Sequence, residues 1–153
     1  MRWSSVLNSD GQVGEFIELT DQNSKGRSGR IIPLNKDLRK ALIKWHVVSS
    51  DMLVPKTWPA MQNRPIISTC RSMGTSSQVI VNALRHWYVD LGYVGASSHS
   101  GRRTFITNAA KQVFAAGGSM RDVQELAGHK SLAMTQRYIE GDAAAKRRLV
   151  DLV

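Results

Sequence analysis

The first third of the chain contains two short stretches in which apolar and polar positions partly alternate. Residues 14–20 read GEFIELT and residues 30–34 read RIIPL, with a polar, glycine-containing stretch, residues 21–29, between them. Such alternation on both sides of a Gly-containing connection is typical of a β-hairpin. We therefore expect a small antiparallel sheet near the N-terminus. Its second strand should end close to Pro33, because proline cannot donate a hydrogen bond to the ladder.

Most of the remaining chain has apolar residues at helical spacing. Asn35 is a candidate N-cap for a helix over residues 36–48, with Leu38, Ala41, Leu42 and Trp45 on one face. Residues 50–75 hold three of the four prolines and predict a long loop, with one short strand as an option at residues 66–67. Helices are predicted at residues 75–91, 100–114, 119–126, 132–138 and 143–152. For the second of these, the inward residues are expected to be Phe105, Ile106, Ala109, Val113 and Phe114. The predicted fold class is α+β and mostly α-helical.

Length and charge narrow the class of protein. A chain of 153 residues suits one domain, residues 1–153, around one core. Lys and Arg number 21 and Asp and Glu 12, so the net charge is 21 − 12 = +9, which favours a polyanionic partner such as DNA, RNA or an acidic membrane surface. A generally basic protein is the plainer interpretation. No apolar run approaches a membrane span or a signal-peptide core, and the lone Cys70 fits a reducing compartment.

Five residues are candidates for a site that binds phosphate and reacts with it. His99 and Arg102 form an H-x-x-R motif at a predicted helix start, where backbone N–H groups and a guanidinium can hold an anion. His129 follows a helix-ending glycine, and Tyr138 lies nine positions further on. Lys25 lies in the hairpin connection. Each has a plainer explanation, namely packing for the tyrosine, capping for His129 and solvation for the lysine, so only their combination points to a site.

These blocks, taken in order, resemble the tyrosine recombinases of the phage integrase family. Residues 29–34 resemble the family strand that ends in Ile-Pro-Leu, and residues 126–138 resemble its block in which L-L-G-H is followed by T-x-x-Y. Residues 99–109 resemble the H-x-L-R-H-T-F-A-T block, with Gly101 and Arg103 as variants. The resemblance runs from about Met1 to Tyr138 and implies the catalytic fold of these DNA breaking-rejoining enzymes.

The resemblance also implies a role for each of the five residues. Tyr138 would be the nucleophile, giving a 3′-phosphotyrosyl link and a free 5′-hydroxyl. Arg102 and His129 would bind the scissile phosphate and stabilise the charge of the transition state. His99 would act as a proton acceptor or phosphate ligand, and Lys25 as the general acid on the leaving oxygen. This chemistry needs no metal or other cofactor, since fixed cations take the place of a metal.

The implied partner is double-stranded DNA, bound by a homo-oligomer that is a tetramer in the full-length protein. Arg103, Arg137, Lys130 and Arg27 are the additional candidates for DNA contact. The implied setting is the bacterial cytoplasm, where a phage or other mobile element would integrate at a specific site. Lys146, Arg147 and Arg148 form a basic run that either contacts phosphate or is simply solvated.

One part of the family pattern has no counterpart. A block like T-G-x-R-x-x-E, carrying another catalytic arginine, should precede a segment like residues 1–6 and would therefore fall upstream of Met1. Arg2 lies after that position and does not replace it. We therefore expect a fragment of a longer recombinase, a chain begun at an internal methionine, or a natural remnant. Two other functions stay open, a catalytically impaired DNA-binding or regulatory module and a type IB topoisomerase.

Overall fold

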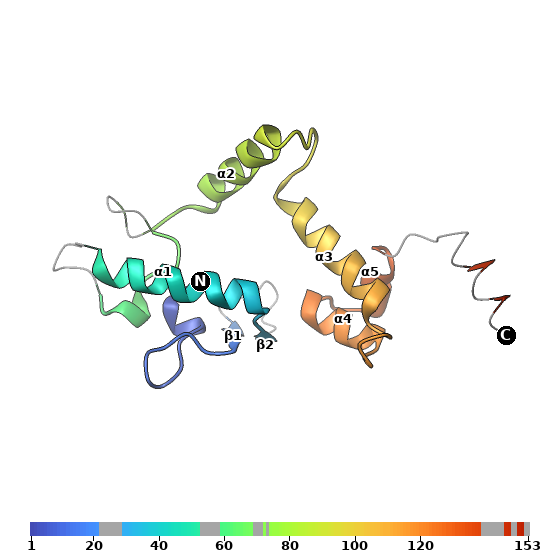
Figure 1. The fold of residues 1–153 in the computed structure, drawn as a ribbon, viewed down its shortest axis with the longest axis horizontal. Helices are drawn as coiled ribbons and strands as arrows, with labels where there is room; N and C mark the ends of the chain where they lie inside the picture. Colours follow the sequence, from blue (N-terminus) through green and yellow to red (C-terminus); the bar gives the residue numbers. More distant parts are fainter. Residues whose placement is uncertain are drawn as a thin grey trace. The chain divides into compact units, whose positions relative to one another are not determined.

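The structure, a computed structural model, describes residues 1–21, 29–52, 59–68, 72, 74–138, 146–147 and 150–151. Figure 1 shows short strands near the N-terminus and helices over most of the rest. This confirms the predicted fold class, mostly helical with a small antiparallel sheet. The chain divides into two compact units, Met1–Ile80 and Val81–Val153. Each is described separately below, and the predicted single-domain organisation stays a prediction.

The predicted hairpin is present in the first unit. Strand β1, Phe16–Leu19, pairs antiparallel with strand β2, Arg30–Pro33, so that Phe16 lies opposite Pro33. Gly29 precedes β2, and its N–H donates to the Asp21 carboxylate at 2.7 Å. A Cβ at this glycine would lie 3.0 Å from the Leu19 carbonyl oxygen, a close contact that glycine avoids. The connection between the strands, with Lys25 and Arg27, lies outside the described residues.

A buried apolar cluster holds the first unit together. Its members are Trp3, Val6, Val13, Leu42 and Ile66. Trp3 is supplied by a 3-10 turn, η1, Trp3–Ser5, that the sequence pattern did not predict. A second such turn, η3, Met61–Asn63, packs near it. No strand forms at residues 66–67, and Ile66 serves the core as a single buried side chain.

Helix α1, Lys36–Asp51, begins and packs as its sequence suggests, with one correction. The Asn35 side chain accepts a hydrogen bond from the Leu38 N–H at 2.7 Å, which confirms the predicted N-cap. Leu42 is buried, and Trp45 is partly buried with its indole N–H donating to the Ile66 carbonyl at 2.6 Å. Leu38 is 44% exposed and Ala41 is exposed as well, so the predicted apolar face is buried only in part. The helix meets the core through Leu42 and Trp45.

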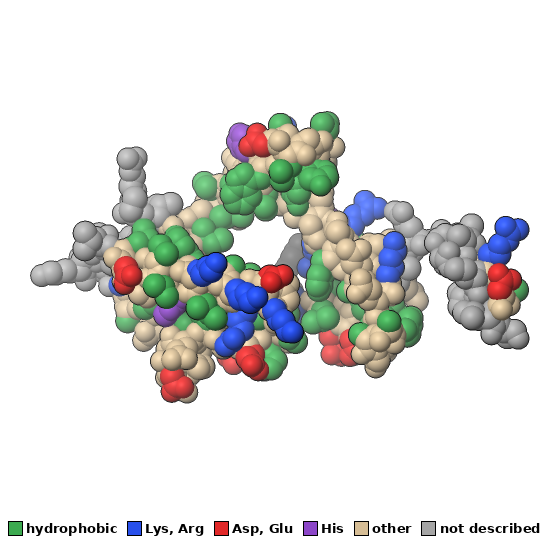
Figure 2. Space-filling model, in the orientation of Figure 1, with side chains coloured by type: hydrophobic (Ala, Val, Ile, Leu, Met, Phe, Trp, Pro, Cys, Tyr) green, Lys and Arg blue, Asp and Glu red, His purple; other side chains and the backbone are tan. Residues whose placement is uncertain are grey.

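The outer surface of α1 is basic. Lys36, Lys40 and Lys44 recur every four residues and are exposed, which places them on one side of the helix. Figure 2 shows Lys and Arg side chains gathered over α1. Arg39 differs, because its guanidinium donates to the carbonyls of Gly14 and Val13 at 2.8 and 3.2 Å and so ties the helix to the preceding loop. The three lysines are therefore the part of this surface that faces solvent.

The second unit is a small helical assembly. It contains the greater part of α2, Ser77–Asp90, followed by α3, Ser98–Gln112, α4, Met120–Ala127, and α5, Leu132–Gln136. Helix α3 packs on α4, and α4 packs on α5 (Figure 1). The buried cluster between them consists of Ile106, Ala110, Val113, Val123 and Ala127. No described helix is both long and apolar enough to cross a membrane.

Two aromatic residues do not take the inward positions predicted for them. Phe105 is 51% exposed and Phe114 is 70% exposed. The contact face of α3 runs through Ile106, Ala110 and Val113, at spacings of four and three residues. Phe105 is rotated about 100° from Ile106 around the helix, and Phe114 follows the end of α3. Likewise no residue of α2 is buried, although its helix lies where predicted.

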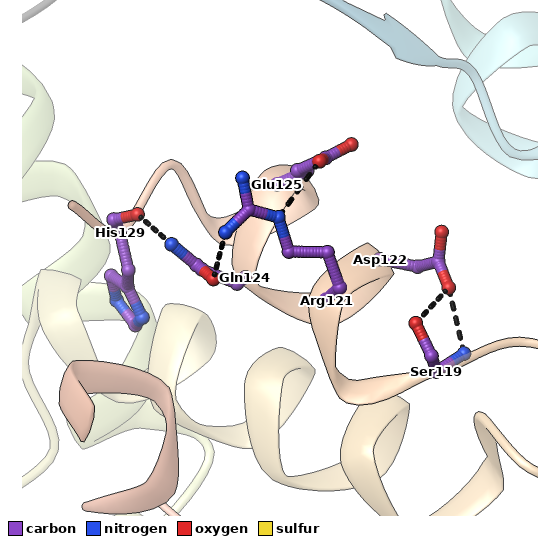
Figure 3. A network of polar contacts seen from close by, with 6 residues as sticks. All are labelled: Ser119, Arg121, Asp122, Gln124, Glu125 and His129. Atoms are coloured by element: carbon purple, nitrogen blue, oxygen red, sulfur yellow. Dashed lines mark hydrogen bonds and ion pairs between the residues drawn. The ribbon is translucent and has the colours of Figure 1, made fainter. Parts of the chain in front are cut away.

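A pH-dependent contact caps α4. Asp122 accepts hydrogen bonds from the backbone N–H and the hydroxyl of Ser119, at 2.7 and 2.8 Å, and these bonds hold the pKa of Asp122 below its ordinary value (Figure 3). The folded state therefore favours the carboxylate. This contribution to the free energy of unfolding is complete above the ordinary carboxyl pKa of about 3.9 and is lost as the pH falls through the lower folded-state pKa.

We therefore expect the thermal midpoint of unfolding to depend less on pH in Asp122→Asn than in the wild type below about pH 4. Near neutral pH, the substitution should lower the midpoint, because the amide loses the charge that favours a helix N-terminus. Calorimetric or circular-dichroism melts between acid and neutral pH measure both effects. Asp10→Asn, at an exposed turn of the first unit, is the control. Parallel pH profiles for wild type and Asp122→Asn would contradict the assignment.

Candidate active site

The start of α3 presents two of the predicted residues. Ser97 caps the helix, since its hydroxyl accepts from the His99 N–H at 3.3 Å and its own N–H donates to the Ser100 hydroxyl at 2.9 Å. His99 thus lies in the first turn and Arg102 one turn later, both exposed. Positions three apart on a helix are neighbours on its surface. The H-x-x-R spacing therefore places an imidazole and a guanidinium side by side at a helix N-terminus.

His129 is turned into the second unit by the glycine before it. Gly128 ends α4 in the left-handed conformation, with φ of 66°, which residues with a side chain rarely adopt. The Gly128 N–H donates to the Glu125 carbonyl and the His129 N–H to the Gln124 carbonyl, both at 3.0 Å. The His129 side chain is consequently buried, with only 8% of the residue exposed. The Gly-His pair is thus needed to reverse the chain and direct the ring inward.

Tyr138 meets both histidines just after α5. Its phenol oxygen lies 3.3 Å from His99 Nε2, and its ring stacks on the His129 ring with centroids 5.3 Å apart and planes at 21°. The Thr107 hydroxyl of α3 donates to the Tyr138 carbonyl at 3.0 Å. The side chain packs against the apolar cluster of the unit and is half-buried. Tyr138 is therefore fixed at its backbone, its ring and its phenol oxygen.

Arg102 reaches the same place from α3. One of its terminal nitrogens, Nη2, donates to the carbonyl of Ala127 at 2.5 Å, directly before the Gly128 turn. A guanidinium carries five N–H donors in a planar fork. The bond to Ala127 fixes the orientation of the fork, and further N–H groups are available to an anion. A phosphate held there would meet a cation beside a phenol and two imidazoles.

The structure thus brings four of the five predicted catalytic residues together within the second unit, namely His99, Arg102, His129 and Tyr138. Lys25 lies outside the described residues. Among the predicted DNA contacts, Arg27 also lies outside them, and Arg103, Lys130 and Arg137 are exposed. The residues that line an open polar depression on α3 are Ser100, Arg103, Thr104, Thr107 and Asn108. The roles of all these residues stay predictions.

Three polar residues that support the site were not singled out from the sequence: Thr107, Gln124 and Thr135. The Gln124 side chain donates to the His129 carbonyl at 2.9 Å, and Arg121 donates to Gln124 at 3.2 Å (Figure 3). The Thr135 hydroxyl lies 3.0 Å from His129 Nδ1. The available signal was a polar residue on a buried helix face, since Gln124 lies between Val123 and Ala127 of the core.

Comparison with known sequences gives one family over most of the chain. A sequence model described as the phage integrase family matches residues 1–144. A tyrosine recombinase XerC of Methylobacterium nodulans is 27% identical over 140 residues, which cover 91% of this chain and 40% of that protein. A XerC of Rhodospirillum centenum is 28% identical over 120 residues, 78% of this chain and 32% of that protein. The chain thus spans well under half the length of these curated relatives.

Solved structures share the fold. The crystal structure of XerA recombinase matches 99% of this chain and 50% of its own, with a TM-score of 0.68 and 23% sequence identity. The Tn1549 transposon integrase, solved in complex with a circular intermediate DNA, matches 100% of this chain and 54% of its own, with a TM-score of 0.61 and 14% identity. At these identities the likeness concerns the path of the backbone.

Proposed function

Because this chain belongs to the phage integrase family, we propose that it carries the catalytic residues of a tyrosine recombinase that cuts and rejoins DNA at a specific site. The observation that carries the proposal is the position of Tyr138, whose phenol oxygen lies 3.3 Å from His99 Nε2 and whose ring stacks on His129. A buried packing tyrosine would need neither imidazole. A nucleophile would use His99 to accept its proton and His129 to hold the phosphate that it attacks.

The reaction transfers a phosphoryl group without hydrolysis. The Tyr138 oxygen attacks the scissile phosphorus, the bond to the 5′-oxygen breaks, and a 3′-phosphotyrosine forms. His99 is the group within reach of the phenol proton. Arg102 and His129 hold the non-bridging oxygens as negative charge develops on them. Lys25 donates a proton to the 5′-oxygen as that oxygen leaves. The 5′-hydroxyl of a second strand then attacks the phosphotyrosine, and the same steps run in reverse.

Double-stranded DNA is the partner that this chemistry requires. The net charge of +9 supplies attraction for phosphate, and Lys36, Lys40 and Lys44 place part of it on one exposed surface (Figure 2). Arg103, Lys130 and Arg137 add cations close to the candidate catalytic residues. The Tn1549 integrase was solved on DNA, which supports the same partner for this chain. We propose that assembly into a tetramer on DNA belongs to the longer recombinase.

The proposal is tested by covalent capture of DNA. A nicked suicide substrate releases a short 5′-hydroxyl strand after cleavage, so that the enzyme cannot rejoin it and the phosphotyrosine accumulates. We expect a protein–DNA adduct that survives denaturing electrophoresis, with DNA attached to the peptide that contains Tyr138. The experiment is run on this chain and on a version extended by a T-G-x-R-x-x-E block, which these 153 residues lack.

The possible outcomes separate the competing functions. DNA binding without an adduct in either version would contradict the recombinase proposal and favour a DNA-binding module. Adduct formation on any duplex, together with relaxation of supercoiled DNA and no preference for a site, would contradict site-specific recombination and favour a type IB topoisomerase. An adduct attached at any residue other than Tyr138 would contradict the assignment of the nucleophile.

A further inference from the structure

Both backbone groups of His129 are hydrogen-bonded to Gln124, one to its main chain and the other to its buried side chain. The Gln124 residue is 6% exposed. Its carbonyl accepts the His129 N–H at 3.0 Å, and its side-chain nitrogen Nε2 donates to the His129 carbonyl at 2.9 Å. The amide oxygen of Gln124 accepts from Arg121, whose guanidinium also pairs with Glu125 at 3.2 Å (Figure 3). The histidine backbone therefore has little freedom to move.

The imidazole of His129 is held separately, by Thr135. The Thr135 hydroxyl lies 3.0 Å from Nδ1, and Thr135 is fully buried at 0% exposed. A buried hydroxyl has one proton to donate, and leaving it without an acceptor is costly. Among the described residues, Nδ1 of His129 is the acceptor within hydrogen-bond distance of the Thr135 hydroxyl. Donation from the hydroxyl to Nδ1 therefore satisfies Thr135 and requires that the neutral ring carry its proton on Nε2.

We propose that Thr135 is a positioning residue, whose hydroxyl donates to Nδ1 of His129 and so keeps the imidazole proton on Nε2, where it can be given to a phosphate oxygen. The proposal rests on the proposed function for the identity of that oxygen. The position of the imidazole proton of His129 can be tested without any catalytic activity. The opposite tautomer would present an unprotonated Nε2 to the phosphate, and two acceptors cannot form a hydrogen bond.

The first test reads the proton directly in the protein without DNA. Nitrogen-15 spectra of the four histidines are recorded at about pH 8, above the ordinary imidazole pKa of about 6.5. The His129 signals are identified by their loss in His129→Gln. We expect Nδ1 at the shift of an unprotonated ring nitrogen accepting a hydrogen bond, and Nε2 at that of a protonated one. A proton on Nδ1 in the wild type would overturn the proposal.

The second test compares two substitutions of Thr135. Thr135→Val keeps the shape of the side chain and removes the hydroxyl, whereas Thr135→Ser keeps the hydroxyl and removes a methyl group from a buried position. We expect Thr135→Val to shift the Nδ1 signal and to slow cleavage of the suicide substrate about three- to tenfold, as for the loss of one hydrogen bond. Thr135→Ser should retain both the Nδ1 signal and the wild-type rate.

The two variants separate positioning from a purely structural role. If Thr135 only filled space, the rates would follow side-chain shape, and Thr135→Ser would be slower than Thr135→Val. Thermal melts of both variants show how much each is destabilised. Rates that follow stability rather than the hydroxyl would overturn the proposal. If neither the wild type nor a variant forms an adduct, in this chain or in the extended version, while the nitrogen-15 signals behave as expected, the proposed function fails and the proton assignment is supported.

Discussion

Tyr138→Phe is expected to abolish covalent capture of DNA while leaving DNA binding intact. Phenylalanine retains the ring, so stacking on His129 and contact with the apolar cluster are preserved. It lacks the phenol oxygen, and with it the only atom of the side chain that can bond to phosphorus. The lost contact with His99 Nε2 is a single exposed hydrogen bond and should change stability by about 1 kcal/mol or less.

Denaturing electrophoresis measures the adduct, and a gel-shift titration of the same DNA measures binding. The matched control is Tyr93→Phe, which removes a phenol oxygen from an exposed tyrosine in the same unit and should leave the adduct unchanged. Undiminished adduct in Tyr138→Phe would refute the assignment of the nucleophile. A loss of DNA binding along with the adduct would show that Tyr138 contributes to the affinity for DNA as well.

Arg102→Lys is expected to slow cleavage by about 10²–10³, the cost of removing one oriented donor for transition-state charge. Lysine preserves the positive charge but not the planar fork. In the wild type, one N–H of Arg102 is engaged by the Ala127 carbonyl while the others can face a phosphate. A single ammonium group on a flexible stem cannot hold the same carbonyl and two phosphate oxygens in one fixed geometry. The deficit should therefore lie in the rate of cleavage more than in DNA affinity.

Single-turnover cleavage at saturating protein isolates that rate. Arg85→Lys, an equivalent exchange at an exposed position of α2, is the control and should cleave like the wild type. Melting curves check that both variants are folded. A lysine variant that cleaves within about twofold of the wild type would show that charge alone suffices, and it would remove Arg102 from the proposed transition-state contacts.

Local sequence signals located the described helices and strands well because their causes are local. The hairpin, the Asn35 cap and the Gly128 stop each depend on residues a few positions apart. Predictions of which side chains face inward were weaker. Phe105 and Phe114 are apolar and near the right positions, yet the contact face of α3 is set by where α4 lies. That information resides in another part of the chain.

The residues of the candidate site show the same difference between local signals and contacts set by distant parts of the chain. H-x-x-R and Gly-His are short patterns whose geometry follows from a helix N-terminus and a left-handed glycine, so the sequence pointed to His99, Arg102 and His129 directly. Thr107 and Thr135 fall on threonine positions of the family blocks, but the sequence did not show what they contact, because their partners lie 31 and 6 residues away. A threonine on a helix looks the same in sequence whether or not it meets such a partner.

The hydrogen bond from Thr107 to the Tyr138 carbonyl gives the second unit a mechanical property. In the proposed covalent complex, the DNA strand would be joined to the chain at the phenol oxygen, and tension on that strand would pass into the backbone of residue 138. The backbone is anchored there to α3, the longest described helix of its unit and the one that carries His99 and Arg102. Strain from a moving DNA end would thus reach the residues that we propose act in rejoining it.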